Sequence, residues 1–336
     1  MANRVINIYP YFRNSGGAQN VALQLAERLN GSFPIVLIST PVDEVPEVYR
    51  QRANYQRLTL RHVKRLADGR TVFISHHRKT TLILLLFQAL LLRKLPIVHV
   101  AHSTFANLRW ATWFPKRCVA ISQAVRQNMI DYFKVPKKDI TVIYNGVKDL
   151  ADGRMLTVPT SEQINILFAG RLCRLKRQVR VAEYLQDKLP PHVQLYFAGV
   201  GEDRETLMDI VGKSGQMHYL GQIELCKEIT RFHYVLLFSE KEGLPLTLLE
   251  SCMFGRPMLT NNIPAAMEIN KDGKTGFVYA DFQSLADGLR KLPLPGSEPY
   301  KALSRNARKE YETKYREDIM VKRYEKLLNS VSREER

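Results

Sequence analysis

Two glutamates, Glu242 and Glu250, stand at the ends of an almost wholly apolar stretch of the sequence, EGLPLTLLE. A carboxylate among leucines loses its hydration, so each acid needs a cation or a hydroxyl group as its partner. Gly243 and Pro245 follow the first acid, and Pro245 suits the first turn of a helix. We therefore expect Glu242 in a loop and Glu250 about one turn inside the helix that follows.

The amides at the start of that helix, including those of Leu246 and Thr247, can bind an anion because no helical carbonyl pairs with them. Beside them, Glu242 would accept hydrogen bonds from sugar hydroxyls and Glu250 from a ribose diol. A simpler interpretation is that Glu242 complements the helix dipole and that Glu250 is solvated. That interpretation accounts for Glu242 but leaves Glu250 among leucines unexplained.

Two cations follow an earlier strand-like segment in FAGRLCRLKRQ: Arg171 comes just after it and Lys176 five residues later. The carboxyl ends of parallel strands face the ligand crevice of an α/β domain, so two cations there suit a diphosphate. Arg174 and Arg177 are also present. A solvated basic helix start therefore explains these residues equally well.

Two glycine turns bring backbone amides within reach of a ligand. FAGVGEDRETL has a Gly-x-Gly turn at Gly199, and NSGGAQN places Gly16 and Gly17 at a strand-to-helix turn. The first also suits an ordinary tight turn, and the second is not the full dinucleotide fingerprint. A nicotinamide cofactor is therefore disfavoured.

His102 ends the strand-like segment VHVAH, with His76, His77 and His99 nearby in the sequence. A lone histidine is more often structural than catalytic. The adjacent His76 and His77 would point to opposite faces of a strand, and no acid has a suitable spacing. We therefore expect no metal site.

Apolar runs alternate with helical patterns along the whole chain. Continuous apolar runs are typical of parallel strands buried on both faces. They occur at 4–12, 34–40, 71–77, 97–103, 118–125 and 140–147, and again at 164–170, 193–199, 217–221, 234–239, 257–262 and 276–280. This alternation predicts an α/β fold with doubly wound sheets.

The length of 336 residues predicts about two domains. Residues 148–163 lose the periodicity and gather Gly, Pro and polar residues, so we expect the linker there. The predicted division is 1–155, 156–310 and a C-terminal helix over 311–336. On that helix Met320, Tyr324, Leu327 and Leu328 share one face.

The apolar segment 80–93 is too short to span a membrane, and we expect a buried crossover helix there. The four cysteines show no C-x-x-C spacing, which argues against a zinc site or a disulfide framework. The first residues lack the apolar core of a signal peptide. A reducing cytoplasm is the simplest compartment.

The positive charge is concentrated in the first half of the chain. Residues 1–150 hold 22 Lys+Arg and 8 Asp+Glu, a balance of +14, whereas the remainder holds 28 and 25, a balance of +3. Nucleic acid, an anionic membrane and an anionic substrate are possible partners, and a solvated surface without a partner also fits. No recognised nucleic-acid module with interleaved aromatic and basic residues is visible.

Together these segments resemble the GT-B glycosyltransferases of family 4, which are retaining and use nucleotide sugars. The matching segments include SGGAQNVALQLAERL, VHVAHS, FAGRLCRLK, FAGVGED, YLGQIE and SEKEGLPLTLLESCMFGRPML. The resemblance implies two Rossmann-like domains facing across a cleft, with a C-terminal helix that crosses back to the first. One departure is Arg177, which stands where the family usually has glycine after the motif lysine.

The resemblance also implies roles for individual residues. Arg171 and Lys176 would hold the donor diphosphate, Glu242 the transferred sugar, and His102 would contact that sugar near its reacting carbon; we group these four as catalytic. Glu250 would bind the ribose, and the region Gly221–Ile223 would lie by the base. Gly17 would approach the diphosphate or the acceptor from the opposite domain. The complete donor-binding set is Gly17, Gly199, Gly221, Gln222, Ile223, Gly243, Leu244, Pro245, Leu246, Thr247 and Glu250.

The expected reaction moves a hexose or N-acetylhexosamine, from UDP-sugar on the family's precedent, to a hydroxyl of a lipid-linked or surface glycan. Lipopolysaccharide core, O-antigen and capsule are the expected kinds of acceptor. No Asp-x-Asp occurs, so we expect neither a metal nor another cofactor. We expect a cytoplasmic protein, peripheral at the inner face of the membrane through its basic first half, with no nucleic-acid partner.

Two other classes of function are retained as alternatives. A nucleic-acid-binding α/β protein is suggested by the charge alone. A glycoside hydrolase could use two carboxylates, but it would leave Arg171 and Lys176 without a role.

Overall fold

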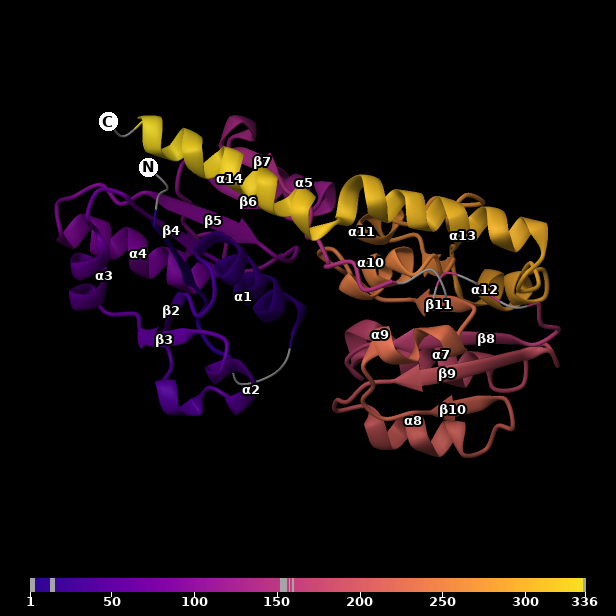
Figure 1. Cartoon of the computed structure of the whole chain (residues 1–336). Coiled ribbons are helices and arrows are strands. Elements are labelled where there is room, and N and C mark those ends of the chain that lie inside the picture. Colours follow the sequence, from indigo (N-terminus) through magenta and orange to yellow (C-terminus); the bar gives the residue numbers. More distant parts are fainter. Residues whose placement is uncertain (1–3, 13–15, 152–155, 157, 159, 335–336) are drawn as a thin grey trace. The chain divides into compact units, whose positions relative to one another are not determined.

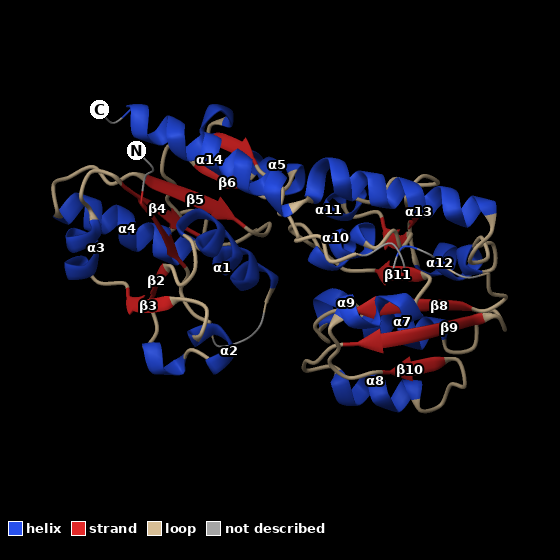
Figure 2. Ribbon diagram, in the orientation of Figure 1, coloured by secondary structure: helices blue, strands red, loops and turns tan. Residues whose placement is uncertain are grey.

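The computed structural model describes residues 4–12, 16–151, 156, 158 and 160–334 (Figure 1). The chain forms two compact units: the N-terminal unit, Met1–Asn145 with Asp318–Arg336, and the C-terminal unit, Gly146–Glu317. Each unit contains one parallel sheet with helices (Figure 2). The predicted α/β class with two Rossmann-like domains is confirmed.

The sheet of the N-terminal unit has seven parallel strands in the order β3-β2-β1-β4-β5-β6-β7. Their bounds are β1 Arg4–Ile8, β2 Ile35–Ile38, β3 Asn54–Arg57, β4 Thr71–Ser75, β5 Ile97–Ala101, β6 Cys118–Ala120 and β7 Ile140–Val142. Every residue of β4 and β5 is buried, as continuous apolar runs predict. Sequence reasoning missed β3, because this edge strand is polar and buries only Tyr55.

The helices of the N-terminal unit are α1 Gly17–Asn30, α2 Glu47–Arg50, α3 Leu60–Leu66, α4 Arg78–Leu90, α5 Gln123–Asp131 and α14 Glu317–Glu334. Helix α14 follows the C-terminal unit in the sequence, but its residues from Asp318 onward belong to the N-terminal unit. This agrees with the expected C-terminal helix that returns to the first domain. On α14 the side chains of Met320, Tyr324 and Leu328 are buried, whereas Leu327 is half-buried.

The sheet of the C-terminal unit has six parallel strands in the order β10-β9-β8-β11-β12-β13. They are β8 Ile164–Ala169, β9 Val193–Ala198, β10 Met217–Tyr219, β11 Tyr234–Leu237, β12 Met258–Asn261 and β13 Gly276–Tyr279. The helices are α7 Gln178–Leu185, α8 Arg204–Val211, α9 Leu225–Glu228, α10 Leu246–Met253, α11 Pro264–Met267, α12 Phe282–Leu289 and α13 Glu298–Glu310. All six strands coincide with predicted apolar runs.

The two units divide between Asn145 and Gly146 and again between Glu317 and Asp318. The described part of the expected linker, 148–163, therefore lies within the C-terminal unit. Asp149 holds this segment there through an ion pair with Arg308 on α13, 2.6 Å between Oδ2 and Nη2. This division differs from the expected boundaries at 155/156 and 310/311, because α13 holds the start of the aperiodic segment and the C-terminal unit extends to Glu317.

Helix α4 is the expected crossover between β4 and β5, but it is not buried along its length. Thr80, Thr81 and Leu84 are buried, while Leu86 and Leu90 are exposed. In the part of the chain that the structure describes, no helix combines the length and the apolar character needed to cross a membrane.

Candidate active site

The predicted cations and acids lie in the C-terminal unit, in the segments that follow β8 and β11, and Lys176 and Glu242 contact each other. These strands are parallel neighbours, with Tyr234 opposite Ile166. The loop after β8 carries the cations, and the loop after β11 leads into α10. The amide of Glu240 donates to the carbonyl of Leu175 across 2.8 Å, so the two loops are joined directly.

Lys176 and Glu242 form an ion pair between these loops, with 2.5 Å from Nζ to Oε1. Their side chains are 26% and 12% exposed, so water screens the pair less than an ion pair on the open surface. Sequence reasoning gave Lys176 to the diphosphate and Glu242 to sugar hydroxyls, and the structure pairs them with each other. Both remain able to bind a ligand, because an ammonium has three donors and a carboxylate has two oxygens.

Arg171 follows β8 immediately after Gly170, where it is exposed and pairs with no described acid. Arg177, which replaces the family's usual glycine, adopts the left-handed conformation with φ 58° and ψ 22°. That conformation costs a side-chain-bearing residue about 1–2 kcal/mol relative to right-handed backbone. The substitution therefore leaves the glycine-like shape of the loop intact.

Glu250 lies one turn into α10, and its carboxylate forms no hydrogen bond or ion pair with any residue that the structure describes. It keeps a partly exposed edge, yet burial of the carboxyl group raises its pKa to about 7. Burial, and then the nearby charge of Glu250, raises the pKa of Cys226 to about 11. Glu250 is thus close to α9, which follows the predicted base-binding region.

The other predicted donor-binding residues cluster around these loops. Gly243, Leu244 and Pro245 are buried, and Pro245 caps α10 rather than occupying its first turn. Leu246 and Thr247 are half-buried at the start of the helix. Gln222 is exposed, whereas Ile223 packs against a small core cluster that includes Leu167, Ala198 and Phe232.

Gly199 brings the loops after β8 and β9 into backbone contact. It has φ +134°, and a Cβ there would lie 1.9 Å from the carbonyl oxygen of Gly170. Its amide donates to the carbonyl of Gly221 across 2.7 Å, which adds the loop after β10. The Gly-x-Gly segment is therefore a close contact between loops, not only a tight turn.

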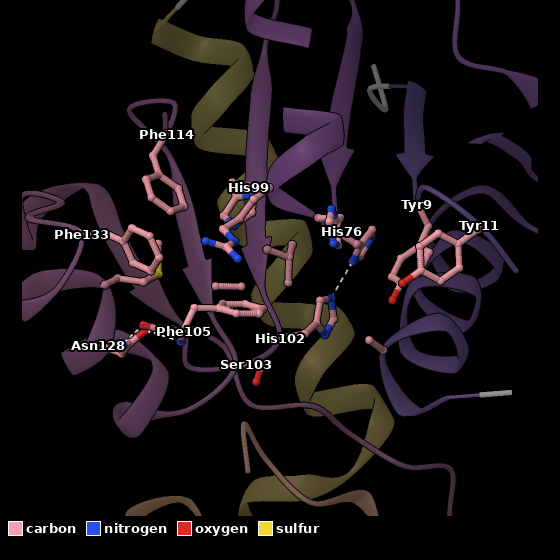
Figure 3. A pocket seen from close by; sticks show the side chains of 16 residues that line it. Tyr9, Tyr11, His76, His99, His102, Ser103, Phe105, Phe114, Asn128 and Phe133 are labelled. Atoms are coloured by element: carbon pink, nitrogen blue, oxygen red, sulfur yellow. Dashed lines mark hydrogen bonds between the residues drawn. The ribbon is translucent and has the colours of Figure 1, made fainter. Parts of the chain in front are cut away.

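The N-terminal unit contains a cavity of about 300 Å³ near the carboxyl ends of β1, β4 and β5 (Figure 3). Its wall combines aromatic rings with histidines and one arginine. The lining residues are Tyr9, Tyr11, Ala18, His76, His77, Arg78, His99, Val100, Ala101, His102, Ser103, Phe105, Phe114, Asn128, Met129 and Phe133. Of the predicted site residues, only His102 lines it.

Three polar side chains on neighbouring strands β1, β4 and β5 or just after them form a hydrogen-bonded chain, and two of them line this cavity. His76 Nε2 lies 2.8 Å from Asn7 Oδ1, and His76 Nδ1 lies 2.9 Å from His102 Nε2 (Figure 3). Burial lowers the pKa of His102 to about 4 and that of His76 well below its usual value, so both rings are neutral at pH 7. With Asn7 Oδ1 accepting, His76 carries its proton on Nε2 and His102 on Nε2.

The other two histidines that line the cavity, His77 and His99, form hydrogen bonds with other residues. His99 Nδ1 lies 2.7 Å from Thr81 Oγ1, and His77 Nδ1 accepts the amide of Lys79 at the start of α4. Among the described residues, no three His, Cys, Asp or Glu side chains are arranged to hold a metal ion.

Sequence reasoning missed Arg78, whose guanidinium lies 4.0 Å from the ring centroid of Phe105. It pairs with no described acid and donates to the carbonyl of Asn107 across 3.0 Å. Its place just after β4, at the same sheet edge as His102, is the signal that could have found it. Gly17 opens α1 and is exposed, and Gly16 before it caps the helix.

Comparisons with known proteins match both halves of the chain. The family model described as Glycosyltransferase Family 4 matches residues 15–149, and that described as Glycosyl transferases group 1 matches residues 157–310. The chain belongs to the family 4 glycosyltransferases.

Individual relatives match at low sequence identity and over only part of the chain. The O-antigen biosynthesis glycosyltransferase WbnH of Escherichia coli is 24% identical over 151 residues, 44% of this chain and 42% of that protein. The match thus spans under half of WbnH. Another O-antigen biosynthesis glycosyltransferase of Escherichia coli, WclY, is 25% identical over 218 residues, 60% of this chain and 59% of that protein.

Among solved structures, Anabaena Alr3699/HepE in complex with UDP has a TM-score of 0.81 at 15% identity, covering 97% of this chain and 100% of that one. This likeness confirms the predicted GT-B fold.

Replacing Glu250 by Gln tests its burial. Because folding raises the pKa of Glu250 from 4.5 to about 7, the native state loses stability as the pH rises through that interval. At pH 8 we expect the free energy of unfolding of Glu250→Gln to exceed that of the wild type by about 2 kcal/mol. The partly exposed edge of the carboxylate limits this gain. Urea unfolding at pH 8 and pH 4 measures it, and an equal difference at both pH values would contradict the burial.

Replacing Gly199 by Ala tests the contact between loops. The new methyl group would overlap the carbonyl of Gly170, so we expect a loss of about 2–4 kcal/mol in the free energy of unfolding. Gly215→Ala is the control, because a Cβ there meets nothing within 4 Å. Equal melting temperatures for the two variants would show that the loops do not press together.

Proposed function

We propose that this protein transfers a hexose or N-acetylhexosamine from a UDP-sugar to a hydroxyl of a glycan, with retention of the anomeric configuration. The observation that carries the proposal is the convergence of Arg171, the Lys176–Glu242 pair and the unpaired Glu250 at one sheet edge. Family membership and the fold of a UDP-bound relative support it.

The residues of the C-terminal unit would stabilise the leaving group. As the glycosidic bond breaks, negative charge builds on the diphosphate, and fixed donors aimed at that charge lower the barrier. Arg171, Lys176 and the amides at the start of α10 would supply them. The leaving phosphate would accept the proton of the acceptor hydroxyl on the same face of the sugar, which accounts for retention without a protein base.

Each glutamate would then bind hydroxyls rather than transfer protons. Glu242, fixed by Lys176, would accept hydrogen bonds from the transferred sugar. Glu250, which lacks a protein partner among the described residues, would accept them from the ribose. We propose that the reaction needs no metal or other cofactor, because the cations already oppose the diphosphate and the sequence has no Asp-x-Asp.

We propose that the N-terminal unit binds the acceptor. Its cavity is lined by aromatic rings, which pack against the apolar faces of sugars, and His102 would contact the transferred sugar. The names of the O-antigen relatives support an anionic or lipid-linked glycan of the lipopolysaccharide core, O-antigen or capsule. The +14 balance of residues 1–150 supports a cytoplasmic protein bound peripherally to the inner face of an anionic membrane rather than to nucleic acid.

Lys176→Ala tests the role of the cation. We expect a loss of about 100-fold or more in UDP release from the donor, because one charge that opposes the diphosphate disappears. Arg174→Ala is the matched control, since Arg174 is an exposed cation of the same loop. A screen of UDP-, GDP- and ADP-sugars by thermal shift first selects the donor, and EDTA should leave turnover unchanged.

Two outcomes would contradict the proposal. One is a Lys176→Ala variant that melts like the wild type and keeps its full turnover. The other is release of sugar from a glycan without any nucleotide donor, which would favour a two-carboxylate hydrolase.

The affinity for UDP should depend on pH through Glu250. The ribose hydroxyls donate to the ionised carboxylate, so binding favours the form that predominates above a pKa of about 7. We expect UDP to bind about tenfold more weakly at pH 6 than at pH 8, apart from the ionisation of UDP itself. Calorimetry on Glu250→Gln provides that correction, and the same pH dependence in both proteins would exclude Glu250 as the ribose ligand.

A further inference from the structure

The only two tryptophans of the protein are exposed in the same loop, between β5 and β6. Trp110 is 88% exposed and Trp113 is 60% exposed, and Leu108 beside them is 67% exposed. Large apolar side chains grouped together at a surface mark a site of interaction with a protein, a ligand or a membrane. Nothing in the proposed chemistry uses these three side chains.

The loop is held in shape although its tip is exposed. Arg78 donates to the carbonyl of Asn107 across 3.0 Å and to Thr112 Oγ1 across 3.3 Å. Thr112 Oγ1 in turn donates to the carbonyl of Leu108 across 2.7 Å. The apolar tip is thus ordered in advance, so a partner need not pay for ordering it.

The sequence on both sides of the loop carries charge of a single sign. Between Asp68 and Asp131 the sequence holds nine lysines and arginines and no acid. Within the loop, Lys116 is exposed, and Arg109 is half-buried with its guanidinium 5.3 Å from the ring centroid of Trp110. Tryptophan concentrates at membrane–water interfaces, and exposed cations are attracted to anionic headgroups.

We infer that the segment 103–117 seats the protein on an anionic bilayer, with Leu108, Trp110 and Trp113 entering the interface. This inference rests on the proposed function, because it names the surface that meets the membrane. Phe105 and Phe114 of the same loop line the cavity of the N-terminal unit (Figure 3). A glycan attached to a membrane lipid would therefore reach that cavity directly from the surface on which the loop rests.

A soluble glycan stacked on the tryptophans is the competing occupant. A stacking platform explains the indole rings, but it gives no role to the exposed Leu108 or to 62 consecutive residues, 69–130, without an acid. An anionic bilayer explains all three features, because its interface takes up aliphatic and aromatic side chains while its headgroups attract the cations.

Intrinsic tryptophan fluorescence tests the inference without a label, since both tryptophans lie in this loop. We expect the emission of the full chain to shift to shorter wavelength on adding vesicles of phosphatidylethanolamine and phosphatidylglycerol. Phosphatidylcholine vesicles should give a much smaller shift. Trp110→Phe and Trp113→Phe, each leaving one tryptophan, show which ring enters the interface.

Flotation of variants with the same vesicles measures the affinity. We expect the double variant Trp110→Ser/Trp113→Ser to lose about tenfold or more, and Arg109→Gln and Lys116→Gln about fivefold each at low salt. Phe33→Ser is the matched control, because Phe33 is 56% exposed in the same unit but outside the loop. The control should keep the wild-type affinity.

Release of UDP from the donor, measured without vesicles, separates this inference from the proposed function. We expect the double variant to retain it, since no residue that it changes belongs to the donor site. Vesicle binding by a wild type that turns over no nucleotide sugar would support the surface while the proposed function fails. An active protein with no vesicle-induced shift, or with a shift caused only by a soluble oligosaccharide, would overturn the inference.

Discussion

The ion pair between Lys176 and Glu242 holds together the loops on which the donor site depends. These loops leave adjacent parallel strands, so their first residues are neighbours by topology alone. The strands do not fix how far apart the loops stand. The Nζ–Oε1 contact of 2.5 Å and the backbone bond from Glu240 to Leu175 do so. The positions of Arg171 and of the start of α10 follow from that spacing.

Unlike Glu242, which pairs with Lys176, Glu250 has a buried carboxylate to which the fold supplies no partner among the described residues. A buried, unpaired acid destabilises the native state when it ionises, and such groups persist where a ligand provides the missing hydrogen bonds. The pair and the unpaired acid therefore suit different tasks: Lys176 fixes Glu242 in one geometry, while Glu250 awaits the hydroxyls of its ligand.

Most of the fold could be predicted from the sequence, because strands buried on both faces are apolar throughout. Strands β4, β5 and β11 are buried at every position and lie in such apolar runs. The other strands of the C-terminal unit also lie in predicted apolar runs, although β9 and the edge strand β10 are only partly buried. Strand β3 at the sheet edge does not, and it was missed. The burial of α4 was overestimated, because an apolar sequence does not reveal how much of a helix the sheet covers.

The candidate donor site was predicted as a region but not as a set of contacts. The sequence could place Gly199, Lys176 and Glu250, because each follows a recognisable strand by a small number of residues. The pairing of Lys176 with Glu242 could not be predicted, since it depends on the tertiary approach of two loops 66 positions apart. For the same reason the sequence did not reveal the chain from Asn7 through His76 to His102, or the position of Arg78 against Phe105.

The central claim is that Glu250 receives the hydroxyls of the nucleotide, and the carboxyl carbon of this one residue reports on it directly. Its ¹³C signal, assigned by comparison with Glu250→Gln, can be titrated with pH in the free protein and with saturating UDP. The account predicts a pKa of about 7 in the free protein and a clearly lower value with UDP, because hydrogen bonds to the carboxylate favour its ionised form. An unchanged or higher pKa with UDP bound would contradict it.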